Sequence, residues 1–450
     1  MRQFCIVFRG GHNIMAKICM FAANYLPHVG GIENYTYHLS KELISMGHSV
    51  TVVTSNLYDN LAHECSEKID VYRLPCYSLI GDRYPVCKIN KEFKKIEEKL
   101  RKYKFDLIVI HARFYIHSIY AARFACKQGI RCITIEHGTS HLSMNNMLLD
   151  FGVRIWEHGI TAVLKRYCKH FYGACKLSCE WSKHFGINSE GVLSNAVDIE
   201  DIRLKMNWSV FNYRKEYNIS DNDLVICYTG RIIPEKGIMQ LIMAFNELRL
   251  LNSYLFVAGD GPMLSELMKE KNDRVIFSGA IDYAHVISLL KDSDIFCLPS
   301  VSEALSTSIL EAIATNTLVI TTKRGGATEL LTDRSYGIIM ESNSVEEIKE
   351  AILNALDKNY RLRCTGKAYT RLVETISWRN TAQSIMKIID LQGEIVEENN
   401  CIALIDEIEN KVSREEIVAN KVDMWNNLAE QYLPLIIHEK FCHGQTEKLF

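Results

Sequence analysis

The sequence predicts two α/β domains, each with a parallel, doubly wound sheet, that face each other across a cleft. Short apolar runs typical of buried strands alternate with helical spacing from Lys17 onward, which is the pattern of right-handed βαβ units. The alternation lapses near residues 189–197 and restarts at Leu224. A chain of 450 residues is also long enough for two large domains.

Four strands and one helix are predicted in the first half of the chain. The helix covers Ile32–Gly47, where apolar residues recur at helical spacing and Gly47 supplies a C-terminal glycine. The expected strands are Ile18–Tyr25, Ser49–Thr54, Asp106–His111 and Arg131–His137.

Five short strands are predicted in the second half, each followed by a turn and a helix-like stretch. They are Leu224–Thr229, Tyr254–Ala258, Arg274–Ser278, Asp294–Leu298 and Leu318–Thr322. A helical segment at Asn380–Leu391 is expected to close the second domain.

These patterns divide the chain into five parts. Residues 1–14 are an N-terminal extension, because Met15 looks like the natural start of the first strand. Residues 15–192 form the first domain and 193–378 the second. The closing helix takes residues 379–392. Residues 393–450 form an acidic tail, helical in pattern, to which the sequence assigns no role.

Composition excludes several classes of protein. Hydrophobic residues make up 48% and charged residues 24%, an ordinary globular balance, and a net charge of −2 argues against a nucleic-acid binder. Fifteen cysteines without a CxxC pair predict reduced thiols in a cytoplasmic protein. We expect neither a signal peptide nor a transmembrane span, since the chain has no convincing cleavage site and no long apolar run.

Two glutamates mark the stretch around which the chain is organised. A strand ends at Leu298, a polar loop carries Glu303, and a helical pattern from about Ser306 carries Glu311. Both carboxylates can therefore point into a crevice beyond the strand's carboxyl end, where open α/β sheets bind ligands. Carboxylates suit the vicinal hydroxyls of a ribose or pyranose, and the start of the helix suits a phosphate.

Two cations follow the first strand of the second half. Arg231 and Lys236 lie in the loop after Leu224–Thr229, beside Gly230 and Gly237. Arginine offers a planar fork of donors and lysine a mobile point charge. Together they can neutralise a diphosphate as negative charge grows on it during bond cleavage.

The first half contributes uncharged groups. Gly30 and Gly31 follow its first strand, where glycine lets a backbone N–H approach an anion or a sugar. His137 ends its fourth strand and can hydrogen-bond a sugar hydroxyl or partner a charge. Two DxD triplets, Asp221–Asp223 and Asp292–Asp294, lack further oxygen ligands in the sequence, so no metal is predicted.

Two basic stretches interleave cations with apolar and aromatic residues. Residues 88–104 read as a basic helix with Ile89, Phe93, Ile96 and Leu100 on one face, and residues 154–172 include Trp156 and several cations. Each stretch fits either contact with an anionic membrane surface or an ordinary helix that buries its apolar face.

Taken together, these motifs resemble the retaining glycosyltransferases of family 4, glycosyltransferase group 1, over roughly residues 15–392. The resemblance rests on the order of Gly30-Gly31-Ile-Glu, Gly230-Arg231, Lys236-Gly237, Gly259-Asp-Gly261-Pro, the Glu303–Glu311 pair, and Gly325-Gly326 with Glu329. It implies the GT-B fold of two Rossmann-like domains. Where the family commonly has Gly-Phe-Gly after the first glutamate, this chain has Ala304-Leu305-Ser306.

The resemblance also implies a role for each site residue. Arg231 and Lys236 would hold the diphosphate, Glu311 the ribose hydroxyls, and Glu303 the donor-sugar hydroxyls near the reacting carbon. The backbone N–H groups of Leu305, Ser306 and Gly31 would contact phosphate or sugar, and His137 would approach the sugar's 6-hydroxyl. Neither a metal nor another cofactor is implied.

The function predicted from these features is transfer of a hexose or N-acetylhexosamine, with retention, from a nucleotide-diphosphate sugar to a glycan acceptor. A lipid-linked acceptor of surface polysaccharide assembly and a UDP-sugar, ahead of a GDP-sugar, are favoured. We expect a cytoplasmic enzyme with peripheral contact at the inner face of the cell membrane. Two alternatives stay open, namely a nucleotide-sugar 2-epimerase and a catalytically silent partner that binds nucleotide sugar.

Overall fold

A computed structural model describes residues 15–28, 30–79, 84–142, 146–270, 272–301, 303–324 and 326–390. The predicted extension at 1–14 and the predicted tail at 393–450 lie outside these residues. Gly325, which belongs to one of the quoted motifs, lies outside them as well.

The first sheet contains all four strands predicted in the first half of the chain. Its order is β3-β4-β2-β1-β6-β7-β8-β9, and β5 pairs with β4. β3 and β5 run antiparallel to β4, and the other pairs are parallel. The strands are β1 (Lys17–Phe21), β2 (Ser49–Asn56), β3 (His63–Ser66), β4 (Ile69–Leu79), β5 (Tyr84–Cys87), β6 (Leu107–His111), β7 (Cys132–Glu136), β8 (His170–Gly173) and β9 (Gly191–Val192).

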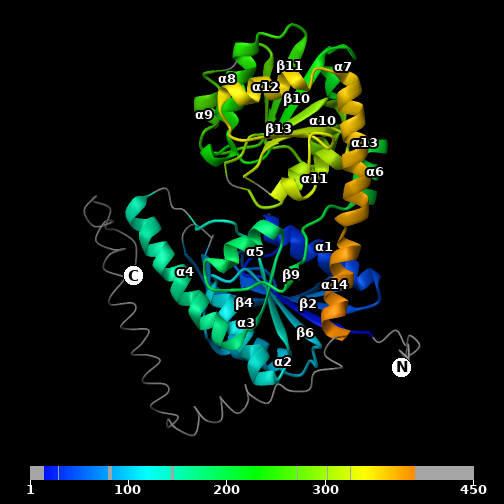
Figure 1. Ribbon diagram of the computed structural model, residues 1–450. Helices are drawn as coiled ribbons and strands as arrows, with labels where there is room; N and C mark the ends of the chain where they lie inside the picture. Colours follow the sequence, from blue (N-terminus) through cyan, green and yellow to red (C-terminus); the bar gives the residue numbers. More distant parts are fainter. Residues whose placement is uncertain are drawn as a thin grey trace, which may run out of the picture. The chain divides into compact units, whose positions relative to one another are not determined.

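Helices cover both faces of this sheet (Figure 1). Alternate residues of β1 show why: Ile18 and Met20 join one hydrophobic cluster, while Cys19 and Phe21 join another. Both faces of the strand are therefore buried, as a doubly wound sheet requires. The helices are α1 (Gly31–Ser45), α2 (Lys91–Leu100), α3 (Ile116–Gln128), α4 (Met147–Tyr167) and α5 (Lys176–Lys183).

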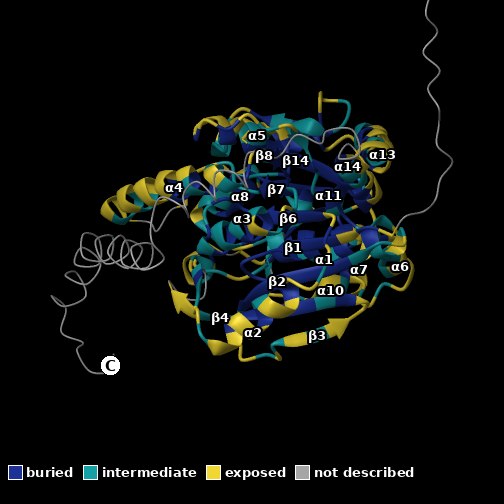
Figure 2. Cartoon of the chain, turned by 90° about the horizontal axis from the view of Figure 1, so that it is seen from below, coloured by how far each residue is buried: buried dark blue, intermediate teal, exposed yellow. Residues whose placement is uncertain are grey.

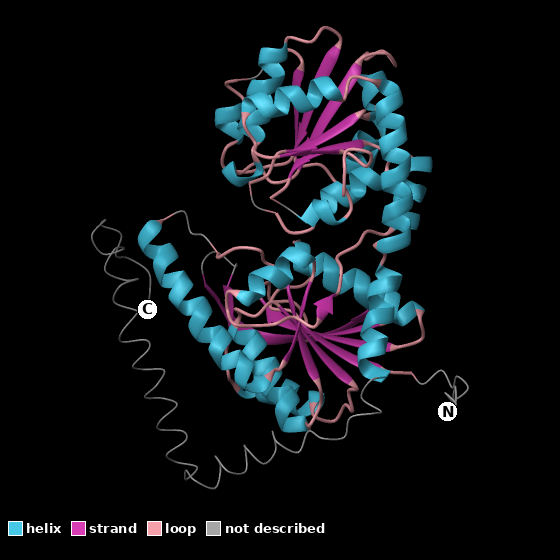
Figure 3. Cartoon of the chain, in the orientation of Figure 1, coloured by secondary structure: helices cyan, strands magenta, loops and turns pink. Residues whose placement is uncertain are grey.

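The second sheet is wholly parallel and contains the five predicted strands and one more. Its order is β12-β11-β10-β13-β14-β15 (Figure 3). The strands are β10 (Leu224–Thr229), β11 (Ser253–Ala258), β12 (Val275–Gly279), β13 (Ile295–Leu298), β14 (Leu318–Thr322) and β15 (Ile338–Met340). The prediction missed β15 because three residues are too few to show a strand pattern.

Eight α-helices accompany the second sheet in the described part of the chain, several of them short. They are α6 (Ile199–Asn207), α7 (Tyr213–Glu216), α8 (Ile238–Leu248), α9 (Leu264–Leu267), α10 (Tyr283–Asp292), α11 (Thr307–Ala314), α12 (Val345–Asn354) and α13 (Lys358–Thr375). α13 packs against β14 and α11.

The last described helix, α14 (Trp378–Asp390), corrects one prediction. The helix exists where expected, but it packs against α1 of the first domain and does not close the second (Figure 1). Trp378 stacks on His38 and meets the edge of Tyr35, and Arg379 pairs with Glu42. Its amphipathic face was visible in the sequence, but the partner of that face depends on a long-range contact.

Among the described residues, no helix combines the length and the apolar character that a membrane span would need.

Candidate active site

The loops that follow β10 and β13 meet at the point where the order of the second sheet reverses. β10 has β11 on one side and β13 on the other, and both neighbours run parallel to it. Chain connections leave in opposite directions from this point, which opens a crevice at the carboxyl ends of the strands. The loop after β10 carries Arg231 and Lys236, and the loop after β13 carries Glu303, so topology brings these predicted residues together.

Glycines let these loops pack closely. Gly237 has a φ of 69°, and a Cβ on it would overlap the carbonyl oxygen of Pro299. Gly259 has a φ of 147°, and a Cβ there would overlap the carbonyl oxygen of Gly230. An L side chain would therefore be strained by its backbone and would also clash. Gly237 and Gly259 thus allow the loops at the carboxyl ends of the strands to pack against each other.

Lys236 and Glu303 form an ion pair between the two loops. Both side chains are mostly buried, with exposed fractions of 15% and 17%, so solvent screens the pair less than it would a surface pair. The Val301 N–H donates to the Glu235 carbonyl at 2.9 Å and ties the loops together again. Arg231 is exposed, and its carbonyl accepts a hydrogen bond from the buried Tyr228 hydroxyl at 2.7 Å.

Glu311 lies inside α11, while Glu303 lies in the loop before that helix, as the sequence predicted. Burial raises the pKa of the Glu311 carboxyl to about 7, because desolvation disfavours the charged form. A group poised near neutrality can accept hydrogen bonds from ligand hydroxyls once it is ionised.

Leu305 and Ser306 lead into α11. The Leu305 side chain is buried in the core, so only its backbone could reach a ligand. Its carbonyl accepts from the Asn195 amide at 3.3 Å, and its amide nitrogen lies 3.1 Å from where a Cβ on Gly326 would sit. Ser306 is the N-cap of α11 but makes no side-chain capping bond. The first-turn amides of α11 are thus left to other acceptors.

Glu329, from the motif after β14, makes its contact outside the second sheet. Its carboxylate accepts a hydrogen bond of 2.6 Å from the Lys176 N–H at the start of α5. A carboxylate at a helix N-terminus is stabilised by the unpaired amides and the helix dipole. We therefore assign Glu329 a structural contact in this conformation.

In the first domain, the loop after β1 places Gly31 at the first position of α1, beside the point where β1 adjoins β6. Gly31 is exposed, and a Cβ on it would meet no atom within 4 Å. A ligand can therefore approach this backbone. Glu33 lies in the same turn and pairs with His28 at 2.7 Å, so the turn already carries one negative charge. The phosphate contact of Gly31 stays a prediction.

His137 directly follows β7 and faces another histidine. Its Nε2 lies 3.1 Å from Nδ1 of His111, the last residue of β6. Burial lowers the pKa of His137 to about 3, so the ring is neutral at physiological pH. A neutral ring can exchange hydrogen bonds with a sugar hydroxyl and can also donate its N–H to an anion, so both roles predicted for His137 stay predictions.

Sequence reasoning missed a buried ion cluster beneath the His137 loop. The fully buried Arg113 contacts Glu136 at 3.3 Å and Glu157 at 3.0 Å. The Gly138 N–H donates to Glu136 at 2.7 Å, which fixes the backbone after His137. Arg113 also lies over the ring of Phe185, 3.6 Å from its centroid. A lone arginine after an apolar strand gave no signal of such a cluster.

Protein partners already hold three of the four carboxylates of the two DxD triplets. Asp294 pairs with Arg214 at 2.8 Å and with Arg361 at 3.1 Å. Asp292 accepts a hydrogen bond from the Tyr213 N–H at 2.7 Å, and Asp223 accepts one from the Ser220 N–H at 3.1 Å. These contacts give the triplets a structural role.

The two basic stretches differ in structure. In α2, Phe93, Ile96 and Leu100 are buried in the core, so they cannot meet a membrane. Ile89, predicted on the same face, precedes the helix and is exposed. The stretch 154–172 is not one element, since α4 ends at Tyr167 and β8 buries Phe171. Burial therefore excludes Phe171 and the apolar face of α2 from a membrane surface, whereas Arg154, Ile155 and Trp156 at the start of the second stretch are exposed, and a membrane contact there stays a prediction.

The first turns of α4 do expose apolar side chains, just before and at the start of the predicted stretch. Exposed fractions are 89% for Met147, 74% for Leu148 and 65% for Phe151, and Ile155 is exposed as well. Figure 2 shows α4 exposed along much of its length. Exposed apolar residues gathered on one helix commonly mark a contact surface.

Two protein-family models match this chain. The model described as "Glycosyltransferase Family 4" matches residues 29–201, and the model "Glycosyl transferases group 1" matches residues 209–371. The first match falls on the first sheet with its helices and the second on the second sheet.

Curated relatives match nearly the same span. The phosphatidylinositol N-acetylglucosaminyltransferase GPI3 subunit of Saccharomyces cerevisiae is 25% identical over 392 residues, covering 84% of this chain and 82% of that protein. The N-acetyl-alpha-D-glucosaminyl L-malate synthase of Bacillus anthracis is 25% identical over 353 residues, covering 73% and 85%.

Solved structures share the fold at lower identity. HepE of Anabaena, in a complex with UDP, aligns with a TM-score of 0.66 and 17% identity over 84% of this chain and all of that one. WaaG, a glycosyltransferase involved in lipopolysaccharide biosynthesis, aligns with a TM-score of 0.58 and 18% identity over 83% and 99%.

Proposed function

We propose that this chain, a glycosyltransferase that belongs to family 4 and has the GT-B fold, transfers an N-acetylhexosamine or hexose from a nucleotide diphosphate to a glycan acceptor with retention of configuration. The observation that carries the proposal is the meeting of Arg231, Lys236 and Glu303 at the reversal point of the second sheet. Two cations that can bind a diphosphate then lie on one loop, and a carboxylate that can bind sugar hydroxyls lies on the adjoining loop.

In the reaction, the bond from the anomeric carbon to the diphosphate oxygen breaks and a bond to the acceptor oxygen forms on the same face. The acceptor hydroxyl passes its proton to an oxygen of the leaving diphosphate. Arg231 and Lys236 stabilise the negative charge that grows on that diphosphate. Such electrostatic stabilisation is usually the largest single contribution to catalysis. Glu303, released from Lys236 when the diphosphate takes its place, accepts hydrogen bonds from the donor sugar near the reacting carbon.

The remaining residues position the donor. Glu311 accepts hydrogen bonds from the ribose hydroxyls, and the Leu305 and Ser306 amides together with that of Gly31 meet phosphate or sugar oxygens. The neutral ring of His137 hydrogen-bonds the sugar's 6-hydroxyl. These residues bind and orient the donor without a metal, since two cations already balance a diphosphate.

A UDP-linked N-acetylhexosamine is the donor we favour. One relative is named as a subunit of an N-acetylglucosaminyltransferase and another as an N-acetyl-alpha-D-glucosaminyl L-malate synthase, and the HepE structure contains UDP. Both observations concern other proteins, and they support the choice of the first donors to test.

A lipid-linked acceptor of surface polysaccharide assembly, met at the inner face of the cell membrane, completes the proposal. The exposed residues Met147, Leu148, Phe151 and Ile155 of α4 would enter the lipid interface, with Arg154 nearby to attract anionic headgroups. A cytoplasmic enzyme with this contact would take its acceptor from the membrane.

Thermal shift with a panel of UDP-, GDP- and ADP-sugars, without added magnesium or manganese, tests the donor. A shift with one nucleotide sugar, followed by slow release of free sugar, would support the transferase and identify its donor. Conversion of the bound sugar to its 2-epimer would contradict transfer. Binding that leads to no chemistry, with or without glycan acceptors, would show a silent nucleotide-sugar binder.

A further inference from the structure

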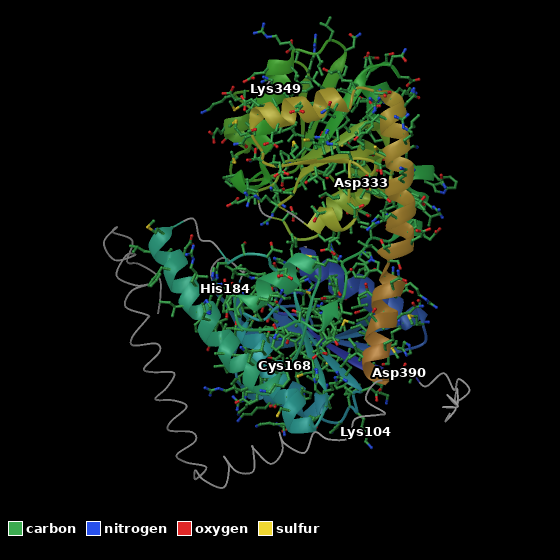
Figure 4. All side chains as sticks on the ribbon, viewed as in Figure 1. Lys104, Cys168, His184, Asp333, Lys349 and Asp390 are labelled. Carbon is green, nitrogen blue, oxygen red and sulfur yellow. The ribbon has the colours of Figure 1, made fainter. Side chains whose placement is uncertain are left out.

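Three histidines from separate elements of the first domain point their ring nitrogens at one another. His141 lies in the loop after β7, His158 lies on α4, and His184 is the C-cap of α5. Nε2 of His184 lies 3.2 Å from Nε2 of His141 and 3.2 Å from Nε2 of His158. Figure 4 labels His184 beside α4. None of these residues belongs to the donor site proposed above.

Hydrogen bonds alone cannot satisfy this arrangement. An imidazole nitrogen carries either one proton or one lone pair, so it makes one good hydrogen bond. Nε2 of His184 faces two other Nε2 atoms at hydrogen-bonding distance, and at most one of these contacts can be a hydrogen bond. The second contact would be at best the weak branch of a shared hydrogen bond, and in other tautomers it would set two lone pairs or two N–H groups against each other.

A metal ion among the three nitrogens would remove this conflict. Zinc binds imidazole nitrogens at about 2.0–2.1 Å in tetrahedral geometry, which places two such nitrogens about 3.3–3.4 Å apart. The spacing of 3.2 Å is close to that value, and the three candidate ligand atoms all lie within 4.8 Å of one another. Nitrogen ligands suit zinc and other transition metals, not magnesium or calcium.

The surroundings of His141 match those of a metal ligand. Its Nδ1 lies 3.1 Å from a carboxylate oxygen of the buried Glu157. Metal-binding histidines commonly donate the second N–H to a carboxylate, which fixes the tautomer and turns the other nitrogen's lone pair to the metal. Glu157 is itself held by Arg113 and accepts from the Leu142 N–H at 2.9 Å.

The other two rings are also held by neighbours. Trp181 stacks on His184 with its ring centroid 5.0 Å away and an interplanar angle of 7°. Phe185 packs against His158 at 4.7 Å between centroids. Glu157, Trp181 and Phe185 thus hold the three rings in place. His158 and His184 are exposed, so an ion can enter from solvent on their side.

We propose that His141, His158 and His184 bind one zinc ion, which clips the loop after β7 to α4 and α5. Three protein ligands leave the fourth position to water. The sequence predicts no metal at the DxD triplets or the donor site, and these histidines lie outside both.

The clip also reaches the His137 loop. From His141, contacts run through Glu157 and Arg113 to Glu136, which accepts the Gly138 N–H. The metal would therefore hold the backbone that carries His137 and would act as a structural ion, distant from the reacting bond.

Zinc titration of the full chain after chelation and dialysis tests the proposal by calorimetry, with elemental analysis for stoichiometry. We expect one equivalent of zinc bound by the wild type and a higher melting temperature with zinc. His158→Ala and His184→Ala should each weaken the affinity at least tenfold. His285→Ala, which removes a partly exposed histidine of the second domain, should leave binding unchanged.

Two further measurements separate ligation from misfolding. His184→Cys supplies another zinc ligand at the same position, so it should keep the affinity that His184→Ala loses. Cobalt in place of zinc should give the visible absorption of a tetrahedral ion in the wild type and lose it in His158→Ala, with the circular dichroism of both unchanged. Equal zinc affinity and stoichiometry in the wild type and in the two alanine variants would overturn the proposal, as would no zinc binding by the folded wild type.

Discussion

The loops at the carboxyl ends of the two sheets differ in their chemistry. Those after β10 and β13 in the second domain carry a cation near the surface, Arg231, and a mostly buried ion pair, Lys236 with Glu303. Those after β6 and β7 in the first domain carry two facing neutral histidines, His111 and His137, over a buried ion cluster. The loops of the second domain therefore present charged groups to a ligand, whereas those of the first domain present neutral histidine rings on a rigidly held backbone.

This difference suggests a division of labour between domains of similar topology. Under the proposed function, the electrostatic stabilisation of bond cleavage would fall to the second domain, because negative charge would develop on the diphosphate held there. The first domain would recognise hydroxyls and apolar surface, which need shape and neutral hydrogen bonds. The predictions that follow test the division, beginning with the largest expected effect.

Loss of the two cations should abolish most turnover. Arg231→Ala with Lys236→Ala should lower kcat by more than about 1,000-fold, since removing one electrostatic donor already costs about 100- to 1,000-fold. Arg249→Ala with Lys269→Ala removes the same charges from exposed positions of the same domain and should leave kcat unchanged. Full activity in the first double variant would refute the diphosphate assignment. The measurement is steady-state transfer at saturating donor.

The apolar turns of α4 should matter for membranes and not for the donor. Leu148→Ser with Phe151→Ser should weaken binding to anionic vesicles about 100-fold, because burying each side chain in lipid contributes about 1.5–3 kcal/mol. Vesicle sedimentation measures the binding.

A matched pair controls for exposed apolar area. Leu204→Ser with Leu362→Ser changes exposed apolar residues on α6 and α13 and should leave vesicle binding intact. Were both double variants to bind like the wild type, the first domain would lose its proposed membrane contact and α4 would need another partner.

Removal of the neutral histidine should affect sugar recognition alone. His137→Ala should lower kcat/KM roughly 30-fold while the affinity for free UDP stays constant, since a hydrogen bond left unmade in a buried site costs about 1–3 kcal/mol. His285→Ala is the control. A matching loss of UDP affinity would instead place His137 at the nucleotide and weaken the division between domains.

Much of the fold and of the second-domain site could be predicted from sequence because the signals are local. Buried parallel strands read as continuous apolar runs, and consecutive loops at one sheet edge converge by topology alone. Local signals were missing elsewhere: β4 contains Pro75, which argues against a strand, and β9 has two residues.

The missed parts of the first-domain site depend on contacts between distant residues. Arg113 and Glu157 are 44 residues apart, and His184 lies 26 residues from His158 and 43 from His141. No short motif has such spacings, so only the fold brings these groups together. The sequence likewise shows the apolar faces of α2 and α14, but it does not show which elements those faces pack against.

The smallest expected effect concerns the pH dependence of Glu311. Donor affinity should rise by up to about tenfold between pH 6 and 8, because ribose hydroxyls donate to the ionised carboxylate and its pKa is about 7. Glu311→Gln should bind more weakly at pH 8 and show no such rise. Calorimetric titration with a nucleotide sugar measures both.

Stability should change in the opposite direction. The folded protein keeps the Glu311 proton up to about pH 7, whereas the unfolded chain loses it near its ordinary value of 4.5. Between these values the native state binds more protons, so the wild type loses stability as pH rises. Glu311→Gln removes this dependence and should exceed the wild type by roughly 3 kcal/mol at pH 8 in urea unfolding, less at pH 5. A variant that loses stability equally at both pH values would show that Glu311 is already ionised in the native state, and the second domain would then hold its ribose carboxylate charged before the donor arrives.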